Sequence, residues 1–166
     1  MTVYVGPAVG AAGSGVAILI GGLQTWVTIT GSGVLVNISG MGEFSSPNPL
    51  TSAALAARHG FPIAWVTGAA GVVIILSAAM HLLGSASAKA IAMKGIALPA
   101  LASGVASIGG LLKKAELIRV QPYDLTSVQL SAGYAPWVVI VASAVALFLS
   151  FSLVGLDEIA ENSSDA

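Results

Sequence analysis

Histidines are the first candidates for acid–base or metal chemistry in this chain. His59 and His81 are the only two, and there is no cysteine. They lie at opposite ends of one long apolar segment, so a helix there would separate the imidazoles by most of its length. They cannot readily share a metal ion, because the ligands of one ion must all lie within bonding distance of it. A ligand or proton-transfer role stays open for each, but an interfacial polar role is commoner.

Carboxylates supply the second set of candidates. Glu43, Glu116 and Asp124, together with Arg119, fall in two polar stretches, where paired carboxylates could do acid–base work. The surrounding sequence contains no nucleophile elbow, glycine-rich phosphate loop or HExxH pattern. Salt bridging or solvation is the better interpretation, and we predict no catalytic residue, no metal site and no cofactor. An enzyme is a third hypothesis, which requires these acids and His59 to cluster in space.

Composition places most of the chain in lipid. Of 166 residues, 56% are hydrophobic and only 8% are charged, and the mean hydropathy is +0.94. A soluble domain carries about 25% charged residues, so these few could not cover a globular surface. The net charge of −1 and the lack of any Lys/Arg run exclude nucleic acid as a partner. The N-terminus lacks a basic region, so the first apolar segment does not resemble a cleaved signal peptide.

The stretch 134–156 is the clearest membrane span. Its 23 residues carry no charge. As a helix they would reach about 34 Å, enough to cross a hydrocarbon core of about 30 Å. Three further spans are predicted at about 7–25, 61–83 and 91–112. In the third only 95–112 is free of charge, so Lys94 should extend its amine to the interface.

Strand patterns occupy the two longer loops. TWVTIT (25–30) and VLVNIS (34–39) flank Gly31-Ser32-Gly33 and predict a hairpin with a three-residue turn. ELIRVQ (116–121) and TSVQLS (126–131) predict a second strand–turn–strand unit. Both loops, 25–60 and 113–133, fall on one side of the membrane, and 51–59 in the first is a short helix. We predict one domain over 1–166: a membrane all-α, four-transmembrane-helix bundle with a small β cap and an acidic tail (157–166) that frays.

Three groups of residues are candidate interaction sites. An interfacial aromatic belt is predicted at the cap end of the bundle: Trp26, Phe61, Trp65, Tyr134 and Trp137. Small residues four apart suit helix–helix packing in lipid: Gly10, Ser14, Gly21, Ala102, Ala106 and Gly110. Because the bundle can bury only one face of the sheet, the cap strands should expose an apolar patch for a partner: Val34, Val36, Ile38, Ile118, Val120, Val128 and Leu130.

The order of these elements resembles a known family. A span, Trp-Val-Thr-Ile-Thr-Gly (26–31), two spans, and Gly133 before a last span resemble the small four-span bacterial proteins related to the tryptophan-operon-associated membrane proteins. The resemblance implies a multi-pass bacterial plasma-membrane protein with both termini in the cytoplasm, and it supplies no catalytic residues. The charges alone leave the orientation open. The layout is also similar to that of claudins, but their cysteine pair is missing.

Two functions other than an enzyme are considered. The favoured one is a non-catalytic accessory or scaffold subunit of a larger plasma-membrane complex (respiratory, transport or envelope-building), with other membrane-protein subunits and lipid as partners. The alternative is a homo-oligomeric carrier or channel for an apolar or uncharged solute. No ionisable residue lies near the centre of a span, which argues against ion coupling. Candidates to line a path are Gln24, Thr67, Ser77, Ser103, Ser107 and Ser143.

Overall fold

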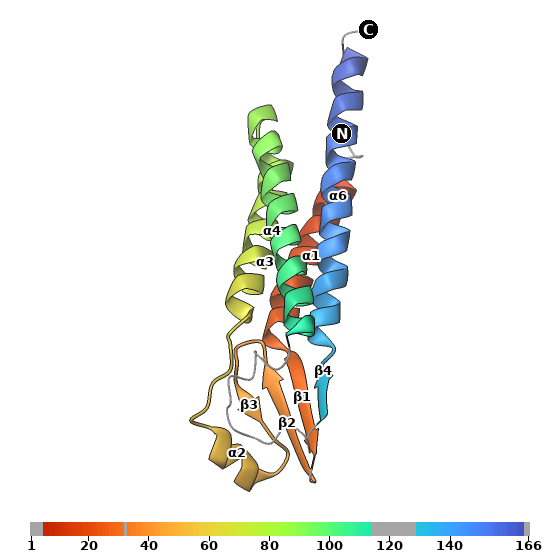
Figure 1. Cartoon of the computed structure of the whole chain (residues 1–166). Coiled ribbons are helices and arrows are strands. Elements are labelled where there is room, and N and C mark those ends of the chain that lie inside the picture. The colour runs from red at the N-terminus through yellow and green to blue at the C-terminus, as the bar shows by residue number, and fades with distance from the viewer. Residues whose placement is uncertain (1–4, 32, 114–128, 165–166) are drawn as a thin grey trace.

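Four long helices lie side by side and form the body of the molecule (Figure 1). The computed structural model describes residues 5–31, 33–113 and 129–164. The long helices are α1 (Val5–Leu23), α3 (Ala64–Leu83), α4 (Ala86–Leu112) and α6 (Ala135–Ser164). α1 and α4 each pack against both α3 and α6, so the four helices close into a ring. At one end of this bundle lie the strands and a short helix, α2 (Pro49–Leu55).

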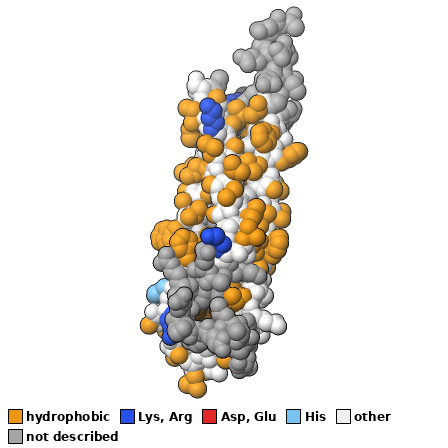
Figure 2. All heavy atoms as spheres, viewed as in Figure 1, with side chains coloured by type: hydrophobic (Ala, Val, Ile, Leu, Met, Phe, Trp, Pro, Cys, Tyr) orange, Lys and Arg blue, Asp and Glu red, His pale blue; other side chains and the backbone are white. Residues whose placement is uncertain are grey.

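The outer surface of the bundle is apolar. Four segments are long and apolar enough to cross a membrane: Val5–Leu23, Ala64–Leu83, Ser87–Leu112 and Ala135–Val154. Figure 2 shows hydrophobic side chains over the visible face of the bundle. Large side chains there are exposed: Leu76 is 60% exposed and Val141 is 62% exposed. Exposed apolar surface on this scale is characteristic of contact with lipid or protein, because water disfavours it.

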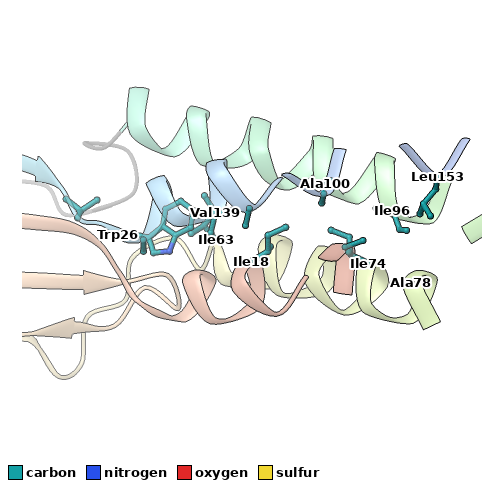
Figure 3. Packing of buried hydrophobic residues seen from close by; sticks show 14 of the residues in the cluster. Ile18, Trp26, Ile63, Ile74, Ala78, Ile96, Ala100, Val139 and Leu153 are labelled. Atoms are coloured by element: carbon teal, nitrogen blue, oxygen red, sulfur yellow. The ribbon is translucent and has the colours of Figure 1, made fainter. Parts of the chain in front are cut away.

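The interior of the bundle is built from branched aliphatic residues alternating with alanine. Ile18, Ile74 and Ile96 come from three different helices and are fully buried, and Val139 of α6 joins them (Figure 3). Alanines such as Ala100 lie between them and have no exposed surface. Small side chains let helix backbones approach closely, and such close packing stabilises helix bundles even without a hydrophobic driving force between helices.

An antiparallel sheet of four strands, order β3-β2-β1-β4, continues one end of the bundle. The strands are β1 (Thr25–Gly31), β2 (Val34–Ser39), β3 (Phe44–Ser45) and β4 (Gln129–Ala132). The predicted hairpin is present, but Gly31 pairs with Val34, so the connection is one residue shorter than the predicted turn. Gly33 has φ +75°, which glycine adopts without the steric cost of a side chain.

Two features of the sheet differ from the sequence pattern. β3 was expected as loop; it forms because Phe44 pairs with Ile38 of β2 after a turn at Gly42, where φ is +80°. β4 overlaps the predicted strand 126–131 but pairs with β1, next to the first hairpin. The predicted strand 116–121 lies outside the described residues.

Helix ends also differ from the predicted spans. α3 starts at Ala64, three residues after the expected start at Phe61, whereas α4 starts earlier, at Ala86, which leaves a short connection after α3. α2 starts at Pro49 because the side chain of Asn48 accepts a hydrogen bond from the Leu50 amide at 3.0 Å. α6 continues to Ser164, through the tail expected to fray.

Candidate functional site

The two histidines occupy opposite ends of the bundle. His59 is exposed beside the sheet, and His81 is 1% exposed in the last turn of α3. They do not come together, and this separation is the one expected from their places in the sequence. Within the described ranges, no three side chains among His, Cys, Asp and Glu are grouped so as to hold a metal.

Two of the four residues required by the enzyme hypothesis are neighbours. Glu43 and His59 face each other in an isolated antiparallel bridge, and the Gly60 amide donates to the Gly42 carbonyl at 2.8 Å. Both side chains are exposed to solvent, whereas catalytic groups are usually held in a cleft. Glu116, Asp124 and Arg119 lie outside the described residues.

Hydroxyl groups in the bundle are used for internal hydrogen bonds. Ser103 of α4 and Ser143 of α6 are buried, and their Oγ atoms lie 2.8 Å apart. Ser107 Oγ donates to the Ser103 carbonyl at 2.8 Å, and Thr67 binds carbonyls of its own helix. Ser77 is 7% exposed, and Gln24 lies outside the core, where its Oε1 accepts from Tyr134 at 2.6 Å. The carrier candidates are therefore mainly packing residues.

The predicted small residues of α1 lie against α6. A Cβ at Gly10 would come 2.8 Å from Leu149 Cδ1, and one at Gly21 would come 2.9 Å from Val139 Cγ2. Ser14 is buried and its hydroxyl donates to the Gly10 carbonyl at 3.0 Å. On α4 the predicted residues differ among themselves: Gly110 is buried, Ala106 is half-buried and Ala102 is exposed.

A helix crossing with direct backbone-to-backbone contact involves glycines outside that set. A Cβ at Gly15 of α1 would come 2.8 Å from the Gly71 carbonyl oxygen of α3, and one at Gly71 would come 2.6 Å from the Gly15 carbonyl oxygen. Only residues without a side chain allow the backbones to approach this closely. The sequence signal for this contact is the seven-residue spacing of Gly15 and Gly22, which places both on one face of α1, and both face α3.

An apolar groove runs along the outer seam between α1 and α6. Its volume is about 620 Å³. Its residues are Gly10, Gly13, Ser14, Ala17, Trp137, Val138, Val141, Ala142 and Val145. The groove carries no charged side chain, so it suits hydrocarbon or an apolar helix better than a polar solute.

Four of the five predicted belt aromatics are exposed at the sheet end of the bundle. Trp65, Tyr134 and Trp137 are 69%, 58% and 57% exposed, and Phe61 is 42% exposed. Trp26 differs: it is 2% exposed, and its Nε1 donates to the Gly21 carbonyl at 3.2 Å. It is a core residue because β1 begins directly after α1 and carries the indole back against the helix end.

The sheet has one apolar and one polar face. Strand register places Val27, Ile29, Val36, Ile38 and Leu130 on the same face. Of the predicted partner residues there, Val36 and Ile38 are 6% and 2% exposed and so are covered within the chain, and Leu130 is half-buried. Val34 remains 40% exposed. Ile118, Val120 and Val128 lie outside the described residues.

In the described strands the opposite face of the sheet is mainly polar, whereas composition predicts an apolar patch. Ser45, Asn37, Thr28 and Ser131 form one row across all four strands. Thr28 Oγ1 donates to Asn37 Oδ1 at 3.0 Å. The alternation of Thr and Asn with Val and Ile in β1 and β2 accounts for the difference, because successive side chains point to opposite faces. Leu35, 40% exposed, is the large apolar residue in the neighbouring row.

Together these observations define a class of protein: a four-helix bundle with an apolar exterior and a mainly aliphatic interior, extended at one end by a small antiparallel sheet. Comparison with family models, with curated proteins and with solved structures finds no match to this chain. The resemblance to the tryptophan-operon-associated membrane proteins stays a prediction.

Proposed function

We propose that the four long helices cross a bilayer, with the sheet outside it. The exposed Trp65, Tyr134 and Trp137 lie at or next to the first turns of α3 and α6, which begin at the sheet end of the bundle. Aromatic rings favour the headgroup region of a bilayer. On α4, Lys94 and Lys113 bound the charge-free stretch 95–112, which as a helix is about 27 Å long. That length fits a hydrocarbon core of about 30 Å when the lysine amines reach the interfaces.

Within the membrane, we propose a non-catalytic accessory or scaffold subunit of a larger bacterial plasma-membrane complex. The observation that carries this proposal is the packing inside the described part of the bundle, where buried aliphatic residues form one cluster and hydroxyls such as those of Ser103 and Ser143 bond to each other. Surfaces that remain uncommitted face outward, at the α1–α6 groove and at Val34 and Leu35 of the sheet. A carrier would instead need a polar or open path, so it is the less favoured function.

The test is purification from the native membrane in a mild detergent. We expect the chain to migrate with other membrane subunits, which mass spectrometry of the purified sample would identify. A monodisperse monomer without partners would contradict the proposal. Uptake of solute into liposomes that contain only this chain would favour the carrier.

A pair of variants locates the contact on the sheet side. Val34→Glu places a charge on the exposed end of β2, and Leu50→Glu places one on α2, where Leu50 is 81% exposed. We expect Val34→Glu to release the partner and Leu50→Glu to retain it, because a charge buried at an interface costs several kcal/mol. Release of the partner by Leu50→Glu and its retention by Val34→Glu would indicate that the partner contacts α2 instead.

A further inference from the structure

Helices α1 and α6 continue almost without interruption into strands β1 and β4. Gln24 alone separates Leu23 from Thr25, and only Gly133 and Tyr134 separate β4 from α6. The two helices pack on each other, and the two strands pair from Val27↔Ala132 to Thr30↔Gln129. The β1–β4 strand pair thus extends the α1–α6 helix pair beyond the end of the bundle (Figure 1).

Hydrogen bonds join the two pairs at the point of transition. The Gly133 amide donates to the Trp26 carbonyl at 2.8 Å, and Trp26 Nε1 donates to the Gly21 carbonyl at 3.2 Å. Tyr134 Oη donates to Gln24 Oε1 at 2.6 Å. Residues of α1, β1 and the β4–α6 connection are therefore bonded to one another, and each lies within a few residues of a transition between helix and strand.

A third connection joins the same point to β2 and α3. The Gly40 amide donates to the Gln24 carbonyl at 2.9 Å, and the Gly40 carbonyl accepts from the Ala64 amide at 2.8 Å. A Cβ at Gly40 would overlap the Gly22 carbonyl oxygen and lie 2.7 Å from Trp26 Nε1. Glycine is required there because the backbone after β2 lies directly on the end of α1.

We infer that this junction, made by Gly21, Gln24, Trp26, Gly40, Gly133 and Tyr134, is a rigid coupling that makes the sheet and the bundle move as one body. Units joined by a small polar contact ordinarily move relative to each other. Here the hydrogen bonds and the buried Trp26 oppose bending at the transition. The β1–β4 strand pair therefore keeps one position relative to the α1–α6 helix pair, across the membrane boundary that we propose.

Paired spin labels on the full-length protein in lipid nanodiscs test the coupling. The chain contains no cysteine, so labels can be attached at Thr30→Cys on the sheet and Leu98→Cys on α4 without other substitutions. Both positions are exposed. A second pair, Leu98→Cys with Phe148→Cys, reports motion within the bundle. We expect the sheet–bundle distance distribution to be as narrow as the bundle–bundle distribution.

Two junction variants and one control complete the test. Tyr134→Phe removes only the hydroxyl donor, and Gly40→Ala forces the β2 end away from α1. Both should broaden the sheet–bundle distribution and leave the bundle–bundle distribution unchanged. Gly13→Ala, whose Cβ would meet nothing within 4 Å, should change neither. The inference is overturned if the labelled protein without a junction substitution already shows a broad sheet–bundle distance distribution. It is also overturned if Tyr134→Phe and a folded Gly40→Ala variant leave that distribution narrow.

Discussion

At the scale of single residues, the hydroxyls of Ser103 and Ser143 show how polar groups are accommodated in an apolar bundle. Their oxygen atoms lie 2.8 Å apart between α4 and α6, and Ser103 Oγ also donates to the Ala100 carbonyl at 3.1 Å. A hydroxyl without a partner in hydrocarbon costs several kcal/mol, so the pair links two helices while satisfying both groups.

Replacing Ser143 should weaken the bundle modestly. Ser143→Ala removes the interhelical bond, but Ser103 keeps its bond to Ala100. We expect the free energy of unfolding in mixed micelles to fall by about 0.6 kcal/mol, the average for such bonds in membrane proteins. Ser152→Ala is the matched control, because Ser152 Oγ bonds only within α6, to the Phe148 carbonyl, among the bonds of the described residues. Equal losses for both variants would refute a specific contribution of the Ser103–Ser143 bond.

At the scale of elements, the α1–α3 crossing depends on backbone-to-backbone contact. Gly15 and Gly71 face each other so closely that a side chain on either would displace a backbone oxygen, which cannot turn away as a flexible side chain can. At Gly10 the α1–α6 contact is more tolerant, since an added Cβ would face only the end of the Leu149 side chain.

Alanine substitution along α1 should distinguish the two kinds of position. Gly15→Ala should lower the free energy of unfolding by about 1–3 kcal/mol, the usual cost of overpacking. Gly13→Ala has open space around the added carbon and should leave stability unchanged or raise it by up to about 1 kcal/mol, because alanine favours helix over glycine. Thermal unfolding in detergent measures both, and a destabilised Gly13→Ala variant with an unaffected Gly15→Ala variant would contradict the packing.

At the scale of the whole molecule, the sheet and the short α3–α4 connection lie at opposite ends of the bundle (Figure 1). In the proposed membrane protein they would therefore face opposite compartments. Lysines and arginines flank both ends of the bundle, so the charges do not decide the orientation. The proposed orientation, with the sheet outside the cytoplasm and the α3–α4 connection inside, therefore rests on the family resemblance.

Cysteine labelling in intact cells tests that orientation. Ser45→Cys lies on exposed β3 and Ser87→Cys lies near the start of α4, and the parent chain has no cysteine to react. A membrane-impermeant maleimide should label Ser45→Cys in intact cells and Ser87→Cys only after permeabilisation. The reverse pattern would place the sheet in the cytoplasm.

The sequence by itself determined the four apolar helices and the first hairpin. Low charge, uninterrupted apolar stretches and the Val/Ile/Thr alternation around residues 31–33 are local patterns, and local patterns specify helices and hairpins because their hydrogen bonds form between residues close in the chain. The absence of charge from the middle of these apolar stretches is visible in the same way.

Only the tertiary structure decided what those elements contact. The pairing of β4 with β1, the burial of Trp26, Val36 and Ile38, and the Gly15–Gly71 crossing join residues distant in the chain. Small residues occur on several faces of α1, and composition alone does not distinguish the face that meets α3 from the one that lines the outer groove. Those choices depend on how complete surfaces fit together, since close packing is a property of all the neighbours at once.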